Sequence, residues 1–137
     1  MMSDNFTVRV NKTNFAIKRK IFSKKFRKFF NKIDYQRKNI CIDTQNSELN
    51  IAISNVFKSL RKYSEKKITA EEILEKENMF DLCLATNWEN LYNPEILNYT
   101  IQAVKKRISL SNYDEIEEFS KKHKIQWLKD VCKQFKG

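Results

Sequence analysis

The chain has 137 residues, and its formal net charge at pH 7 is +10. It contains one glycine and one proline, whereas an average soluble domain of this length carries about ten glycines and about seven prolines. The glycine is the last residue, Gly137, so no internal glycine can form a phosphate-binding loop, a dinucleotide-binding loop or the turn around a catalytic serine. Long helices need no glycine, whereas tight hairpin turns favour it, and the composition therefore predicts an all-α chain.

The positive charge lies in the first part of the chain. Residues 1–40 contain twelve Lys and Arg and two acidic residues, whereas residues 41–137 contain fifteen of each sign. A coding bias toward lysine would act on both parts equally, so it does not explain this partition. We therefore predict a basic amphipathic arm over residues 1–40 and a helical bundle domain over residues 41–137.

The basic segment carries an apolar stripe, formed by Phe15, Phe22, Phe26, Phe29 and Ile33. These residues recur at spacings of three, four or seven, which predicts an amphipathic helix over residues 14–32. Before it, Phe6, Val8 and Val10 alternate with polar residues and indicate a short extended segment. Residues 34–47 are predicted to be a linker.

The rest of the chain shows helical periodicity with clear start signals. The N-caps that we expect are Asn46 or Ser47, Thr69, Asn93 and Asn112. Thr69 and Glu72 have the spacing of a capping box, and Pro94 follows Asn93 at the first helical position. Because the intervening loops are short and polar, the helices should be antiparallel neighbours. The expected fold is a compact bundle of four to five helices.

Several classes of protein are excluded. No apolar run approaches the roughly 20 residues that cross a bilayer. Cys41, Cys83 and Cys132 are widely spaced and form no C-x-x-C pair, which favours a reducing compartment and argues against a zinc site. His123 is the only histidine, and no nucleophile or orienting group can be placed beside it. We therefore predict a protein that is not an enzyme and that uses no metal or cofactor.

Three active roles are open for the basic segment, besides that of a solvated tail. It could bind nucleic-acid phosphates, lie on an anionic membrane surface with its Phe stripe in the interface, or act as a nuclear-import signal. The candidate residues for nucleic-acid binding or import are Lys18, Arg19, Lys20, Lys24, Lys25, Arg27, Lys28 and Lys32. A further alternative is that Phe22, Phe26 and Phe29 pack onto the domain that follows.

Residues 80–137 carry a pattern of apolar positions and a basic helix end. The pattern consists of Leu82, Leu84, Pro94, Leu97, Thr100, Ile101, Val104, Lys105–Arg107, Ile116 and Trp127. In this pattern the chain resembles the N-terminal helical domain of transcription elongation factor S-II, which also occurs in elongin A and Mediator. Residues 46–68 could supply the first helix of such a domain. Gln102, Ser120 and His123 stand where the family has Gly, Ala and Leu.

The resemblance implies a scaffold that binds disordered, often acidic and aromatic segments of transcription proteins and performs no chemistry. The docking surface that it implies by position consists of Lys105, Lys106, Arg107, Ile108, Leu110 and Trp127. We therefore expect an interaction module in transcription or chromatin, located in the nucleus or, alternatively, in the cytoplasm. The alternatives are a nucleic-acid-binding or ribonucleoprotein component driven by the basic arm, and a membrane-surface protein.

Overall fold

A three-stranded β-sheet forms one end of the molecule in the computed structural model, which describes residues 4–30 and 38–137. The strands are β1 (Asn5–Val10), β2 (Thr13–Lys18) and β3 (Asn39–Ile42), in the order β2-β1-β3. β1 is antiparallel to β2 and parallel to β3. Phe6, Val8 and Val10 alternate with exposed residues along β1 and are buried, so the predicted extended segment is confirmed. The all-α prediction is wrong in this part of the chain.

The predicted helix over residues 14–32 is confirmed only over its middle part, and its residues 31 and 32 lie outside the described residues. Residues 14–18 belong to β2, and α1 extends only over Arg19–Lys25. A two-residue turn at Asn11 and Lys12 joins β1 to β2, with φ angles of 47° and 71°. Left-handed angles at both positions are those of the type I′ hairpin turn, which usually contains glycine. Asn11 and Lys12 adopt them without glycine, and the missing glycine therefore did not exclude a hairpin.

Helices make up the rest of the described chain. They are α2 (Ser47–Ser64), α3 (Ala70–Lys76), α4 (Met79–Asn87), the short 3₁₀ helix η1 (Glu89–Leu91), α5 (Pro94–Arg107), α6 (Tyr113–Lys122) and α7 (Gln126–Lys136). Three of the expected N-caps are confirmed. The side chains of Asn46 and Asn93 accept hydrogen bonds from the first turns of α2 and α5, and Thr69 forms a complete capping box with Glu72.

With α1, the described residues form seven α-helices, which is more than the four to five predicted. The helix expected after Thr69 is divided in two, because Asn78 accepts hydrogen bonds from the amides of Phe80 and Asp81 and so begins α4. The last expected helix is divided at Lys124, whose φ of 54° ends the α6 segment. Asn112 precedes α6 but forms no side-chain cap.

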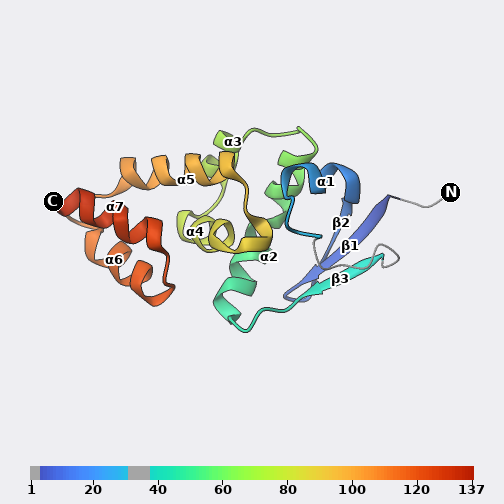
Figure 1. Ribbon diagram of the computed structural model, residues 1–137, viewed down its shortest axis with the longest axis horizontal. Coiled ribbons are helices and arrows are strands. Elements are labelled where there is room, and N and C mark those ends of the chain that lie inside the picture. Colours follow the sequence, from blue (N-terminus) through green and yellow to red (C-terminus); the bar gives the residue numbers. More distant parts are fainter. Residues whose placement is uncertain (1–3, 31–37) are drawn as a thin grey trace.

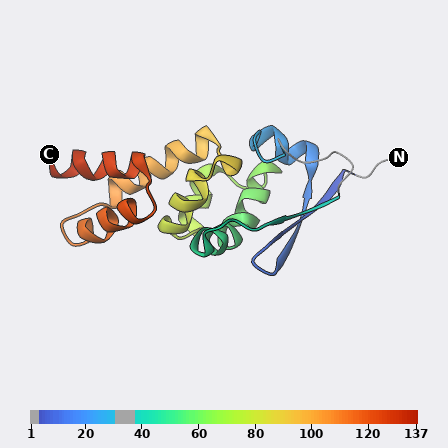
Figure 2. The same ribbon diagram turned by 60° about the horizontal axis from the view of Figure 1, so that its bottom comes forward.

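Two hydrophobic clusters hold these elements together along an elongated molecule (Figure 1). The first consists mainly of residues from the sheet, α1, α2 and α3, with contributions from α4, η1 and α5. The second joins α4, α5, α6 and α7 and includes Ala52 of α2. Figure 2 shows from a second direction that the sheet and the α6–α7 pair lie at opposite ends. α4 contributes Leu82 and Ala85 to the first cluster and Cys83 and Leu84 to the second. The central helices therefore connect the two clusters.

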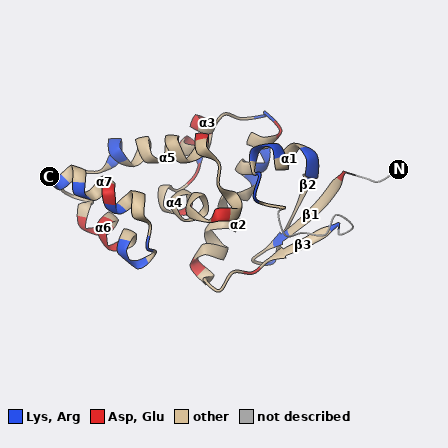
Figure 3. Cartoon of the chain, in the orientation of Figure 1, with Lys and Arg blue, Asp and Glu red and all other residues tan. Residues whose placement is uncertain are grey.

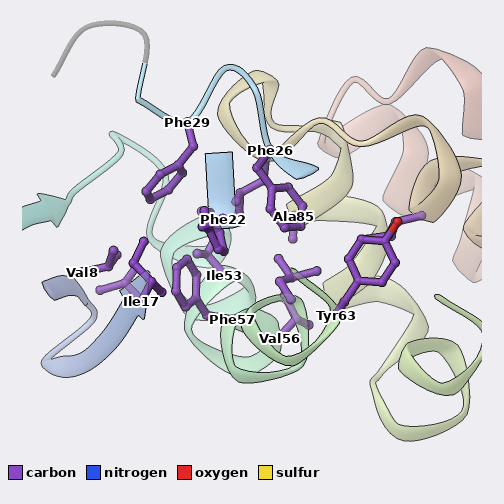
Figure 4. Packing of buried hydrophobic residues seen from close by; sticks show 14 of the residues in the cluster. Val8, Ile17, Phe22, Phe26, Phe29, Ile53, Val56, Phe57, Tyr63 and Ala85 are labelled. Carbon is purple, nitrogen blue, oxygen red and sulfur yellow. The ribbon is translucent and has the colours of Figure 1, made fainter. Parts of the chain in front are cut away.

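The aromatic stripe of the basic segment lies inside the first cluster. Phe22 and Phe26 are fully buried, and Phe29 is 2% exposed. The Phe22 ring stacks on Phe57 of α2 with 5.5 Å between the centroids, and Figure 4 shows these two rings beside Ile53. Of the alternatives for the stripe, packing onto the following helices is the one that the structure shows.

Candidate interaction surfaces

The residues predicted as one docking surface at the end of α5 separate in the structure. Lys106 and Arg107 line a surface hollow between α3 and α5, whereas Lys105 is exposed outside it. Ile108 and Trp127 are partly buried against the second cluster, and Leu110 is 91% exposed. Of the six predicted residues, Lys106 and Arg107 therefore line the hollow, and Ile108 and Trp127 pack against the second cluster. Lys105 and Leu110 do neither.

The α3–α5 hollow has a volume of about 290 Å³. It is lined by Glu71, Leu74, Glu75, Tyr99, Ala103, Lys106 and Arg107. Leu74, Tyr99 and Ala103 are partly buried, whereas the four charged residues are exposed. The arrangement is thus an apolar floor with two carboxylates contributed by α3 and two cations contributed by α5.

Local structure positions both sides of this hollow. The capping box at Thr69 begins α3, and Asn93 begins α5 by accepting from the amide of Ile96 at 3.0 Å. Arg107 Nη2 donates to the carbonyl oxygen of Leu74 at 3.3 Å, which ties the end of α5 to α3. The two helices also pack against each other, and this packing holds both sides of the hollow in place.

Sequence reasoning missed five residues of the hollow. Tyr99, Ala103 and Arg107 are spaced by four, and they therefore share one face of α5. Glu71, Leu74 and Glu75 have the same kind of spacing on α3. This periodicity was visible in the sequence, but the pairing of α3 with α5 was not.

The predicted nucleic-acid or import residues lie on and around α1, where Figure 3 shows Lys and Arg gathered. Lys20, Lys24 and Arg27 are exposed. The Arg19 guanidinium lies over the Phe6 and Phe30 rings, and the Lys25 ammonium lies over the Tyr63 ring.

Two of the remaining predicted basic residues belong to the described chain. Lys18 is exposed at the end of β2, and Lys28 forms an ion pair of 3.5 Å with Glu89. Lys32 lies outside the described residues.

The membrane alternative needs the Phe stripe at the surface. Phe22, Phe26 and Phe29 are instead buried. The surface of α1 therefore presents cations without an aromatic stripe. No helix in residues 4–30 and 38–137 is long and apolar enough to span a bilayer.

His123 lies at a contact between α6 and α2. Its Nε2 is 3.2 Å from Glu48 Oε2, and Lys122 Nζ is 2.8 Å from Glu48 Oε1. The hydrogen bond from Lys122 lowers the pKa of Glu48. The ring of His123 also packs on Phe119, with 4.6 Å between the centroids. The geometry is that of a contact joining two elements.

Burial or a hydrogen bond to one neighbour raises the pKa of three other titratable groups. Burial, together with the hydrogen bond to Glu95, raises the pKa of Tyr63 to about 12. The hydrogen bond to Glu117 raises the pKa of Tyr113 to about 12, and burial raises the pKa of the Cys83 thiol to about 12. These three groups are therefore protonated at neutral pH. Within the described chain, no three His, Cys, Asp or Glu side chains gather as a metal site would require.

Comparison with known proteins found no matching family model, no matching curated protein and no matching solved structure. The interpretation of these surfaces consequently rests on their geometry and on the sequence.

Proposed function

We propose that this chain is a non-catalytic interaction module that binds a disordered protein segment in the α3–α5 hollow. The observation that carries the proposal is the apolar floor of Leu74 and Ala103 between the cations of α5 and the carboxylates of α3. Extended peptides bind such surfaces by placing one side chain in the hollow while rim charges fix their direction.

The size of the hollow limits what it can hold. Small-molecule sites usually enclose about 300 to 1,000 Å³, and this hollow of about 290 Å³ lies at the lower limit. One leucine or phenylalanine side chain of a peptide fits this space better than a whole cofactor does. The preferred segment would carry an acidic residue facing Lys106 and Arg107, and a basic residue facing Glu71 and Glu75.

The proposal also includes a cellular role and a location for this binding. The resemblance in residues 80–137 supports a role in transcription or chromatin and a nuclear location, and it is the sole support for both. Binding of a peptide segment is supported independently, by the hollow itself.

The test is fluorescence anisotropy of the full chain with labelled synthetic peptides that carry Phe or Leu between an acidic and a basic residue. We expect the charge reversal Lys106→Glu/Arg107→Glu to weaken binding at least tenfold, which corresponds to about 1.4 kcal/mol. The matched control Lys105→Glu/Lys133→Glu changes the charge equally outside the hollow and should bind like the wild type.

A second variant separates loss of charge from loss of folding, since Arg107 also donates to Leu74. Ala103→Phe fills the floor without changing the charge and should abolish binding while circular dichroism shows an unchanged helix content. Equal binding by wild type and Ala103→Phe would exclude the hollow as the site. Absence of binding by the wild type to every peptide of the panel would reject the proposed function.

A further inference from the structure

The tertiary structure joins cations that are far apart in the sequence into one surface. Lys24, Lys25 and Lys66 line a hollow of about 250 Å³ between α1 and the α2–α3 loop. Lys25, Lys66 and Lys67 line a neighbouring hollow of about 430 Å³. Lys20 lies one helical turn before Lys24 on α1, and Arg27 follows in the turn after that helix. We define the basic surface as Lys20, Lys24, Lys25, Arg27, Lys66 and Lys67.

The position of Lys66 follows from the way α2 ends. The Lys66 amide donates to the Tyr63 carbonyl at 3.0 Å, and the Lys67 amide donates to the Lys62 carbonyl at 2.9 Å. These two bonds form a Schellman motif, in which the residue after the cap has a left-handed backbone. Lys66 occupies that position with a φ of 61°. The motif therefore holds the loop lysines beside α1.

The acidic side chains near the basic surface contact groups other than the side chains of Lys20, Lys24, Arg27 and Lys66. Glu65 pairs with Lys67 at 3.6 Å, Glu72 belongs to the capping box, and Glu95 accepts from the Tyr63 hydroxyl at 2.7 Å. Asp4 and Glu89 flank the surface. Asp4 accepts from the Lys20 amide at 3.2 Å, and Glu89 pairs with Lys28.

Four cations of the basic surface remain without an acidic partner. In residues 4–30 and 38–137, the side chains of Lys20, Lys24, Arg27 and Lys66 form no ion pair. Like charges one helical turn apart destabilise a helix by about 0.2–0.5 kcal/mol, and Lys20 in the first turn of α1 opposes the helix dipole. An anion bound to Lys20 and Lys24 would relieve both of these unfavourable interactions.

We propose that the basic surface binds the phosphate backbone of a nucleic acid. A membrane is disfavoured because Phe22, Phe26 and Phe29 are buried and leave no aromatic stripe for insertion. A peptide is disfavoured because its charge density is low, whereas duplex DNA carries one negative charge per roughly 1.7 Å of axis. Contacts made by charge alone are strongest with such a ligand.

The test measures binding of the full chain to a labelled mixed-sequence DNA duplex, and to one of its single strands, by fluorescence anisotropy. Four phosphate contacts predict a slope of about −3.6 for log Kobs against log[KCl] on the duplex. The affinity should therefore fall about a hundredfold between roughly 50 and roughly 200 mM KCl. The single strand should show a shallower slope of about −2.8.

Two variants test the surface itself. Lys20→Gln/Lys24→Gln/Arg27→Gln should reduce the duplex slope to about −0.9, and Lys66→Gln alone should reduce it to about −2.7. The Lys66 variant is decisive, because a flexible basic tail would not depend on a lysine of the α2–α3 loop. The matched control is Lys76→Gln/Lys105→Gln/Lys133→Gln, which removes three exposed lysines elsewhere and should keep the wild-type slope.

Three results would overturn the proposal. They are a salt-independent affinity, an unchanged slope in either surface variant, and a control triple variant that loses as much slope as the surface triple variant. A separate measurement uses phosphatidylserine–phosphatidylcholine vesicles in place of DNA. If the chain binds these vesicles as tightly as DNA, and if this binding needs the same lysines, the surface is assigned to membranes instead. Thermal unfolding followed by circular dichroism confirms that each variant is folded.

Discussion

Four residues of the described chain have left-handed backbones although none is glycine. They are Asn11, Lys12, Lys66 and Lys124. Lys66 and Lys124 end α2 and α6 in the position where glycine is common, and Asn11 and Lys12 form the hairpin turn. A left-handed conformation is unfavourable by roughly 1–2 kcal/mol for a residue with a Cβ atom. The chain therefore carries local strain at its turns.

This strain leads to a prediction for Lys66. Lys66→Gly should raise the free energy of unfolding by about 1 kcal/mol, because glycine adopts the left-handed angle without the Cβ penalty. Urea denaturation measures the change. The matched control Lys58→Gly, in the middle of α2, should lower stability by about 1 kcal/mol. Destabilisation by both variants would show that the Lys66 backbone is not strained.

At the scale of elements, the α6–α7 pair is joined to α2 by packing and by charged contacts to Glu48. Lys122 and His123, at the end of α6, meet Glu48 in the first turn of α2. Glu48 also lies at the positive end of the α2 dipole. Hydrogen bonding to Lys122 holds the pKa of Glu48 below its ordinary value of 4.5.

The lowered pKa of Glu48 fixes the sign of its pH dependence. A carboxylate with a lowered pKa stabilises the folded chain above pH 4.5, and this contribution is lost as the pH falls through the folded-state pKa. Glu48→Gln should therefore melt below the wild type at pH 7, and the two melting temperatures should converge in acid. Melting curves from pH 7 to acid check this.

Glu118→Gln is the matched control for this prediction, because Glu118 is exposed on α6. It should follow the wild type at every pH. A constant difference between wild type and Glu48→Gln down to low pH would contradict the assigned contact.

At the scale of the whole molecule, residues 4–30 and the central helices share the first hydrophobic cluster. Phe22 contacts Phe57 of α2, while α4 and α2 contribute to both hydrophobic clusters. Because the clusters share these helices, the described chain should unfold cooperatively. A substitution that destabilises the sheet end should then also lower the stability of the α6–α7 end.

Phe22→Ala tests this coupling, and it should lower the free energy of unfolding by about 3–5 kcal/mol. In a Trp88→Phe background, the fluorescence of Trp127 reports on the second cluster, because Trp127 packs there. The Trp127 transition should shift together with the circular dichroism transition.

The control is Phe135→Ala, at a residue that is 39% exposed. It should lower the free energy of unfolding by about 1 kcal/mol or less. Separate transitions for the two probes would show two independent units.

Residues with strong local signals were predicted well. Asn46, Thr69 and Asn93 begin helices because a cap needs only its own first turn. The apolar stripe was recognised, but only part of it is helical: Phe15 lies in β2, Phe22 lies in α1, and Phe29 lies in the turn after that helix. The spacing of seven between Phe15 and Phe22 does not show that a strand ends and a helix begins between them. Lys106 and Arg107 were singled out, whereas their partners in the hollow depend on which helix packs beside α5.

The sequence by itself determined the helix starts at Asn46, Thr69 and Asn93, the mainly helical composition of residues 46–137 and the alternation along β1, because each depends on neighbours within about one turn. The location of the excess charge is a property of the sequence alone. The tertiary structure alone decided that the basic segment folds into the core, that α3 and α5 enclose a hollow, and that Lys66 lies beside Lys24. The reason is physical: these contacts join residues far apart in the chain, and they are selected by how whole faces pack. Local periodicity does not specify that choice.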